Sequence, residues 1–238
     1  MQDDFMNFTR LFSIVAVISF CSHAYAESKI NIGGIHLGSS AAEAHAGATA
    51  MNKKFKFIDL KRQEDGKTIG FNGSEDGAFP ADSIKVIFTD TNTIWFIYRN
   101  QRYEEGSRPT RDAVFSALKE KYGEPTFSNT KDLLNGNASW HFDRSGKLYH
   151  GPLGKAPCSG TDSRGGGTPP SSFTEHCGVF VQASWNFMNK EKMVQQLEVT
   201  AHESSIVYDA IKKKQDASNE IQRKSLEQEQ SKNIKPKL

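Results

Sequence analysis

Two cysteines, Cys158 and Cys177, enclose a segment rich in glycine, proline, serine and threonine, and this pair is the strongest candidate for chemistry in the chain. A structural zinc ion needs four ligands, whereas only Glu175 and His176 stand beside the pair. A thioredoxin-like redox centre needs the spacing Cys-x-x-Cys, which these cysteines do not have. A phosphate-binding loop would continue as Gly-Lys-Ser/Thr, but the glycine run here is followed by Thr-Pro-Pro. The residue types therefore favour a structural disulfide.

The N-terminus predicts export, which is the condition under which such a disulfide persists. Residues 1–26 have the organisation of a signal peptide. Arg10 supplies the positive charge, and Leu11–Phe20 is an apolar run, too short for the about 20 residues that a membrane-spanning helix needs. Ala24-Tyr25-Ala26 is a cleavage site of the small-x-small type. Met6 is an alternative start, because the two acids that precede it do not suit a leader.

Cleavage after residue 26 removes Cys21 and leaves an even pair of cysteines in the mature chain. Lipid attachment at Cys21 is disfavoured by the bulky Phe20 that precedes it. We therefore expect a protein that is exported, either periplasmic or secreted, with a bridge between Cys158 and Cys177.

The sequence contains no complete zinc or serine-hydrolase motif. His202-Glu203-Ser204-Ser205-Ile206 starts like the zinc motif His-Glu-x-x-His but has isoleucine where the second histidine ligand must stand. The nucleophile elbow Gly-x-Ser-x-Gly of serine hydrolases does not occur. The paired acids Glu75-Asp76 and Glu104-Glu105 stand in polar segments, which predicts solvated rather than catalytic carboxylates. We therefore predict no catalytic residue, no cofactor and no metal ligand. The histidines set aside on this basis are His36, His141, His150 and His176.

The charge distribution argues against polyanionic partners. Residues 27–204 carry 21 basic and 21 acidic side chains, and residues 205–238 carry 8 and 5. Such a balance lacks the basic footprint of a nucleic-acid-binding protein and creates no strong field to steer anionic ligands. After signal cleavage, no apolar stretch of the sequence approaches the length of a membrane span. We expect a protein partner.

The first half of the mature chain predicts one helix followed by strands. Ser40-Ala41-Ala42-Glu43 is a capping box, which predicts a helix from there to about Met51. Phe55–Leu60 reads as a strand, and residues 63–82 as a long loop or an irregular strand. Ile84–Phe88 and Ile94–Tyr98 flank turn residues and predict an antiparallel hairpin that is covered on at least one face.

The second half repeats this order of elements. A helix is predicted from Pro109-Thr110 to Gly123, because apolar residues recur at helical spacing and Pro125 blocks continuation. Residues 138–142 and 147–149 predict a second hairpin. Residues 179–187 and 193–201, joined through 189–191, alternate between apolar and polar with a period of two and predict an antiparallel pair.

These elements predict an α+β fold: an antiparallel sheet with helices packed on one face, two helix-plus-strands units, one disulfide and a C-terminal helix. The units span 40–98 and 110–201, so the body 27–204 divides into candidate subunits 27–106 and 107–204. Residues 205–238 form the last segment. A thin apolar stripe there predicts a helix that docks at its start and frays at its end. The stripe consists of Val207, Ala210, Ile211, Ala217 and Ile221.

Two motifs resemble small exported bacterial α+β proteins. Gly34–Ala44 is similar to their opening G-I-x-L-G-x-S-x-x-E-A. Leu118–Pro125, followed by Trp140-His141-Phe142, is similar to their segment L-x-x-x-Y-G-x-P…W-x-aromatic. Such units occur in the β-lactamase-inhibitor-protein family and in the small lipoprotein of the outer-membrane β-barrel assembly machinery. The resemblance implies a protein that binds proteins and is not an enzyme. The chain departs from these families in its stapled loop and its C-terminal helix, and from the lipoprotein in lacking a usable lipidation cysteine.

Aromatic residues are the remaining candidates for a contact surface, although most aromatics on alternating strands fill the core. Trp95 points away from its strand neighbours if alternation is regular, which predicts exposure. With Arg164 and Phe173 of the cysteine-bounded loop, it forms the predicted set of partner contacts. The leading hypothesis is an exported, non-enzymatic binding protein of the bacterial envelope, of the inhibitor, immunity or assembly-factor type. The alternatives are a hydrolase with a dispersed site and a structural adaptor that acts through its C-terminal helix.

Overall fold

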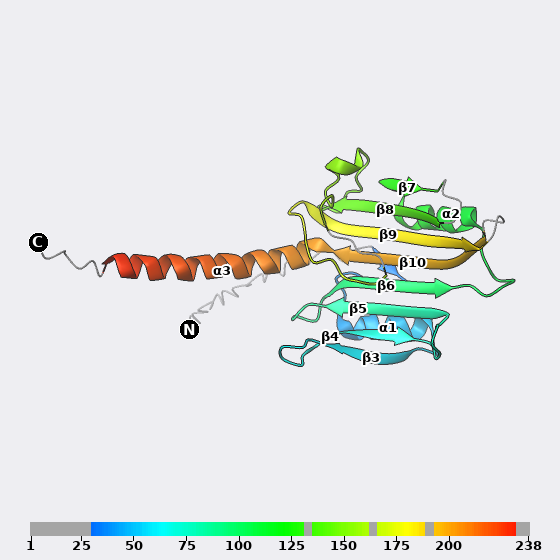
Figure 1. Cartoon of the computed structure of the whole chain (residues 1–238), viewed down its shortest axis with the longest axis horizontal. Helices are drawn as coiled ribbons and strands as arrows, with labels where there is room; N and C mark the ends of the chain where they lie inside the picture. The colour runs from blue at the N-terminus through cyan, green and yellow to red at the C-terminus, as the bar shows by residue number, and fades with distance from the viewer. Residues whose placement is uncertain (1–29, 131–134, 162–165, 189–192, 232–238) are drawn as a thin grey trace, which may run out of the picture.

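The centre of the protein is one eight-stranded antiparallel sheet (Figure 1). The computed structural model describes residues 30–130, 135–161, 166–188 and 193–231. The strand order is β3-β4-β5-β6-β10-β9-β8-β7. The strands are β3 (Lys56–Lys61), β4 (Thr68–Ser74), β5 (Asp82–Phe88), β6 (Ile94–Arg102), β7 (Phe127–Asn129), β8 (Asn135–Asp143), β9 (Cys177–Met188) and β10 (Met193–Glu203). The predicted α+β fold is confirmed.

Each half of the sheet is a four-stranded meander that follows a helix. The helix α1 (Ala41–Met51) precedes β3 to β6, and α2 (Arg111–Tyr122) precedes β7 to β10. Each meander runs from one edge of the sheet to its middle, so the last strands of the two units, β6 and β10, pair with each other. The two predicted helix-plus-strands units are therefore present, and hydrogen bonds between them make a single sheet.

Both short helices begin and end where the sequence predicts. The Ser40 hydroxyl accepts from the Glu43 amide at 3.3 Å, and the Glu43 carboxylate accepts from the Ser40 amide at 2.8 Å, which completes the capping box of α1. Thr110 caps α2 by accepting from the Ala113 amide at 3.2 Å. Gly123 ends α2 with a φ of +86°, a conformation that favours glycine.

The two helices pack on the same face of the sheet and enclose the main core (Figure 1). Tyr122 of α2 lies against Trp140 of β8, with ring centroids 5.4 Å apart. The Trp140 indole also donates to the Gly123 carbonyl at 2.8 Å, which fixes the end of α2 to the sheet. Burial of each large side chain here stabilises the fold by about 1.5–3 kcal/mol. Further members of this core include Ala44, Ala48, Ile84, Val86, Ile97, Val114, Leu118, Val181, Trp185 and Val199.

A two-stranded hairpin lies on this same face, against the seam where the units join. It consists of β1 (Asn31–Ile32) and β2 (Ile35–His36), and β1 contacts both β6 and β10. Its turn passes through Gly33 and Gly34, which have φ values of +60° and +84°. The Tyr122 hydroxyl donates to the Asn31 carbonyl at 2.9 Å and connects this hairpin to α2.

Two segments fold differently from their predictions. Segment 63–82, predicted as a loop or an irregular strand, contains the regular strand β4, which pairs with both β3 and β5. The predicted hairpin of 138–142 with 147–149 is reduced to one bridge, between Phe142 and Leu148. Backbone hydrogen bonds from the Asp143 amide to the Lys147 carbonyl and from the Tyr149 amide to the His141 carbonyl flank this bridge. Along its length, β8 pairs with β7 and β9.

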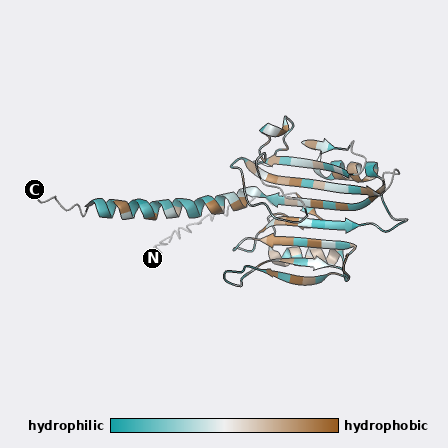
Figure 2. Cartoon of the chain, viewed as in Figure 1, coloured by the Kyte–Doolittle hydropathy of each residue, from teal (hydrophilic) through white to brown (hydrophobic). Residues whose placement is uncertain are grey.

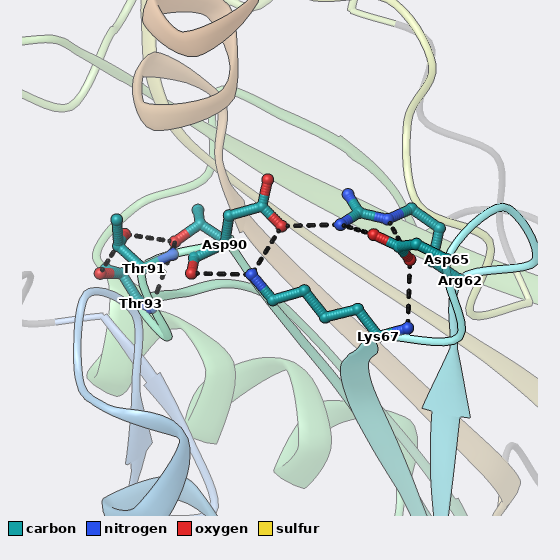
Figure 3. A network of polar contacts seen from close by, with 7 residues as sticks. Arg62, Asp65, Lys67, Asp90, Thr91 and Thr93 are labelled. Atoms are coloured by element: carbon teal, nitrogen blue, oxygen red, sulfur yellow. Dashed lines mark hydrogen bonds and ion pairs between the residues drawn. The ribbon is translucent and has the colours of Figure 1, made fainter.

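Charged side chains connect two neighbouring turns at one end of the sheet (Figure 3). Arg62 donates to Asp65 at 2.8 Å and to Asp90 at 3.0 Å. Lys67 shares the Asp90 carboxylate, at 3.2 Å. The network therefore connects the β3–β4 turn to the β5–β6 turn, whose Asn92 carbonyl accepts from the first amide of α1. All four charged groups keep solvent contact, so salt screens their attraction and the network aligns these turns more than it stabilises them.

A close backbone approach inside the sheet predicts a sensitive glycine at position 70. A Cβ atom at Gly70 of β4 would lie 2.3 Å from the Val86 carbonyl oxygen, and that backbone atom cannot move aside. We expect Gly70→Ala to lower the free energy of unfolding by about 1–3 kcal/mol, as overpacking does in tight interiors. Gly154→Ala is the matched control, because its Cβ would meet no atom within 4 Å, and it should change stability by less than about 0.5 kcal/mol. Chemical denaturation measures both; equal effects would contradict the close approach.

Candidate functional site

The predicted disulfide joins Cys158 to Cys177. Both side chains are buried, at 3% and 0% exposure. Cys177 is the first residue of β9, so the bridge fastens the start of residues 158–177, hereafter the stapled loop, directly to the sheet. Disulfides persist in oxidising compartments, which agrees with the predicted export. The predicted leader, 1–26, and Arg164 lie outside the described residues.

The stapled loop lies on the face of the sheet opposite α1 and α2, across β5 and β6. Lys85 of β5 donates to the Gly167 carbonyl at 2.9 Å. A Cβ at Gly167 would lie 2.6 Å from the Tyr98 ring of β6, so the loop backbone rests directly on this ring. Gly166 and Gly167 both have a φ of +73°, which explains why the sequence has glycines here. The described residues of the loop therefore cover part of the second face.

Trp95 lies under this loop, and the prediction that it is exposed is wrong. Ile87 pairs with Phe96 and Phe88 with Ile94, which leaves Trp95 as the extra residue of a β-bulge. A bulge breaks the alternation on which the prediction rested. The Trp95 ring lies 5.8 Å from that of Phe96 and 6.0 Å from that of Phe173 in the stapled loop. Two of the three predicted contact residues are thus brought together, half-buried and packed against each other.

A second, smaller core lies beneath the disulfide on this face. Phe180 of β9 packs with Cys158 and Cys177, and it lies between two buried histidines, His141 and His202. The strand register places these histidines on opposite sides of it, since Phe180 pairs with both. The ring centroids of the histidines are 4.9 and 5.1 Å from that of Phe180. No sequence pattern indicated this arrangement, because it depends on the register across three strands.

Burial holds both histidines in their neutral form. Desolvation lowers the pKa of His141 from 6.5 to about 4. Desolvation and, secondarily, the neighbouring His141 lower the pKa of His202 to about 3. Each ring has one polar contact, His141 with the Ser139 hydroxyl at 3.2 Å and His202 with the Ser204 hydroxyl at 3.0 Å. The near miss to a zinc motif at His202 is therefore a buried structural histidine.

Arg144 connects the disulfide region to the third helix, α3 (Ser204–Ser231). Its guanidinium donates to both carboxylate oxygens of Asp209, at 2.8 and 3.1 Å, and lies over the Tyr208 ring at 5.3 Å. The same guanidinium donates to the Glu175 carbonyl of the stapled loop. Hydrogen bonding to Asp209 raises the pKa of Arg144. One side chain thus joins the turn after β8, the stapled loop and the base of α3.

Beyond this clamp, α3 projects away from the body (Figure 1). Every residue from Asp209 to Gln230 is exposed except Glu220, which is partly exposed. The surface of the helix is mainly hydrophilic with isolated apolar positions (Figure 2). Three large apolar side chains stand out in solvent: Ile211, Ile221 and Leu226. The predicted C-terminal helix is confirmed, and no helix in the described ranges combines the length and the apolar character needed to cross a membrane.

An open pocket of about 710 Å³ separates the turn after β8 from the stapled loop. Its ionisable lining includes Asp143, Lys147, His150 and His176. The Asp143 carboxylate is used by its own turn, where it accepts from the Ser145 hydroxyl and amide and from the Lys147 amide. Within the described residues, no three histidine, cysteine, aspartate or glutamate side chains gather as a metal site would require. The hydrogen bond from the Ser145 hydroxyl is the main cause of the lowered pKa of Asp143.

The disulfide should stabilise the fold measurably. Removing it in a Cys158→Ala/Cys177→Ala variant frees a loop of this length, which in the chain-entropy model costs about 3 kcal/mol of unfolding free energy. Denaturant titration of the wild type and the variant measures this loss. In native protein, both sulfurs should resist reduction until denaturant is added, because both side chains are buried. Rapid alkylation under reducing but native conditions would contradict the buried bridge.

The two histidines should make stability depend on pH. The folded-state pKa values of the two histidines, about 4 and about 3, lie below the ordinary value of 6.5. Between these folded-state values and pH 6.5, the unfolded chain therefore binds more protons than the folded chain does. The stabilisation is therefore complete above pH 6.5 and is lost progressively as the pH falls towards 3. His202→Gln should flatten this dependence, whereas His150→Gln, at an exposed position, should leave it unchanged. Denaturant midpoints from pH 4 to 8 measure it; equal slopes in all three proteins would contradict the buried histidines.

Comparison with known proteins finds no relative. No family model matches the chain, no curated protein matches it, and no solved structure matches it. The resemblance of Gly34–Ala44 and Leu118–Pro125 to exported bacterial binding proteins therefore stays an expectation from those motifs.

Proposed function

We propose that this chain is an exported, non-enzymatic protein that binds a different protein through the exposed face of α3. The observation that carries the proposal is the isolation of this helix. It contains 28 residues, contacts the body only near its start, and exposes nearly every residue beyond Tyr208. Most helices in folded proteins gain their stability from packing an apolar face, and α3 has no such packing within the described chain.

The exposed apolar side chains indicate which face would be covered. Ile211 is 49% exposed, Ile221 70% and Leu226 58%. At 3.6 residues per turn these three positions fall within less than half of the helix circumference, and Ser218 lies among them. Asp216 projects from the other side. An amphipathic helix that inserts such anchors into an apolar groove is a common mode of protein recognition.

The charges of α3 favour a protein over a polyanionic partner. The helix has five basic and five acidic side chains and so no net charge. Several of these charges pair within the helix, since Arg223 bonds Glu220 and Glu227, and Lys224 bonds Glu220. A membrane-surface helix or a nucleic-acid-binding helix would instead present an excess of lysine and arginine. Apolar contact would therefore dominate binding.

The Arg144 clamp supports the same reading. It holds the base of α3 through Tyr208 and Asp209, so the helix leaves the body in a defined direction. A helix held at one end loses less conformational freedom on binding than an unattached segment does. The Trp95 surface favoured by the sequence becomes secondary, because Trp95 packs against Phe173.

Site-directed photo-crosslinking in the native organism tests this function. A benzoyl-phenylalanine placed at Ser218 should yield one discrete adduct with a different protein, and the same residue at Asp216 should yield little. Adding Ile211→Asp and Ile221→Asp should abolish the Ser218 adduct, while circular dichroism shows the body still folded. The control pair Lys213→Asp and Asp216→Lys alters charge on the opposite side and should preserve it. Equal adducts at both positions, or an adduct only between two copies of this chain, would contradict the proposal.

A further inference from the structure

A second concave surface lies where the two units of the sheet meet. On the helix-bearing face, α1 covers one unit and α2 the other, and a groove of about 390 Å³ remains between α2 and β1 over the seam of β6 and β10. Its size falls in the range of small-molecule sites, which often form where two structural units adjoin. This groove is on the opposite face from the stapled loop and is independent of α3.

The floor of the groove is apolar. It is made by Val114 and Leu118 of α2, Leu197 and Val199 of β10, and Ile32 of β1. All five side chains also belong to the main core, so the floor is rigid and already formed. An apolar ligand body could rest on it without further rearrangement of the sheet.

The polar lining is cationic. Arg99 of β6 donates through Nε and Nη2 to the two oxygens of Asp82, at 3.0 and 2.7 Å, and both side chains of this pair are largely buried. These bonds leave Nη1 without an acceptor in the described residues. Lys121 of α2, exposed at the rim, has no acidic partner among them either. The groove is therefore lined by two cations, of which only Arg99 is paired, with Asp82, and an excess of one positive charge remains.

The surroundings of Lys121 and Tyr103 agree with this imbalance. Desolvation lowers the pKa of Lys121, and the nearby positive charge of Arg99 lowers it further. Desolvation raises the pKa of Tyr103, which keeps its hydroxyl protonated as a neutral donor. Tyr103, Gln101 and Ser107 line the same groove and add uncharged hydrogen-bonding groups. A carboxylate near Lys121 and the free Arg99 nitrogen would supply the missing negative charge.

We propose that this groove binds a small hydrophobic carboxylate, with its acid group between Lys121 and Arg99 and its apolar body on the floor formed by α2 and β10. Charge complementarity selects an anion, and the apolar floor selects one with a hydrocarbon or aromatic body. The single excess charge favours one carboxylate over a diacid or a phosphate ester. Binding requires no metal and no chemical step.

Octanoate is the probe for this site, and octan-1-ol is the uncharged control of the same chain length. Titration calorimetry on the full mature chain should show octanoate binding at one site, with octanol at least roughly fivefold weaker because it lacks the charge. Lys121→Met should lower the affinity for octanoate by roughly five- to tenfold and leave the affinity for octanol unchanged. Lys119→Met removes the same charge from the same helix outside the groove, where Lys119 pairs with Glu124, and should change octanoate affinity by less than about twofold.

A steric variant separates this site from any other. Ala117 is exposed and lines the groove, so Ala117→Trp fills it at little cost to folding and should abolish octanoate binding with every charge retained. Circular dichroism confirms that each variant is folded. Absence of saturable octanoate binding, equal affinity for octanol, or full binding by the folded Ala117→Trp variant would each overturn the proposal. The photo-crosslinking of α3 is unaffected by any of these results.

Discussion

The pairing of β6 with β10 is the contact on which the rest of the structure depends. Each unit alone would be a four-stranded meander with one helix, and its last strand would be an open edge. Antiparallel bonds from Arg102–Gln196 to Phe96–His202 close both edges against each other. The buried residues Ile97 and Ala201 face each other across this pair, so a slip of one residue would turn the apolar side of one strand towards solvent. This constraint fixes how the two units sit together.

Each candidate site follows from that seam. The groove exists because the two helices are centred over different units and leave the middle of the face to β1. On the other face, the register across β6, β10, β9 and β8 aligns Phe96, His202, Phe180 and His141 in one row. The stapled loop covers part of this row. The helix α3 continues directly from β10, so its direction is set by the central strand of the sheet.

Local patterns accounted for much of this fold. The capping box at Ser40 and the glycine stop at Gly123 placed α1 and α2, and the period of two placed β9 and β10. These signals succeeded because each one reports the physics of a few neighbouring residues. The regular strand β4 was not predicted, because its glycines at positions 70 and 73 weaken any strand pattern. Those glycines are there because neighbouring atoms leave no room for a side chain, as the Val86 carbonyl does at Gly70.

The sites were harder to predict because they depend on contacts between distant segments. Trp95 was selected by assuming regular alternation, but one extra residue in β6 turns it towards Phe96 and Phe173. No sequence pattern within β6 predicts this β-bulge, which is visible only in the pairing of β5 with β6. Arg144 stands in a turn like many other surface arginines, yet it meets both Glu175 and Asp209, which lie far along the chain. Its position links the disulfide region to the projecting helix. The bridge holds the stapled loop, the loop offers Glu175 to Arg144, and Arg144 holds the first turns of α3.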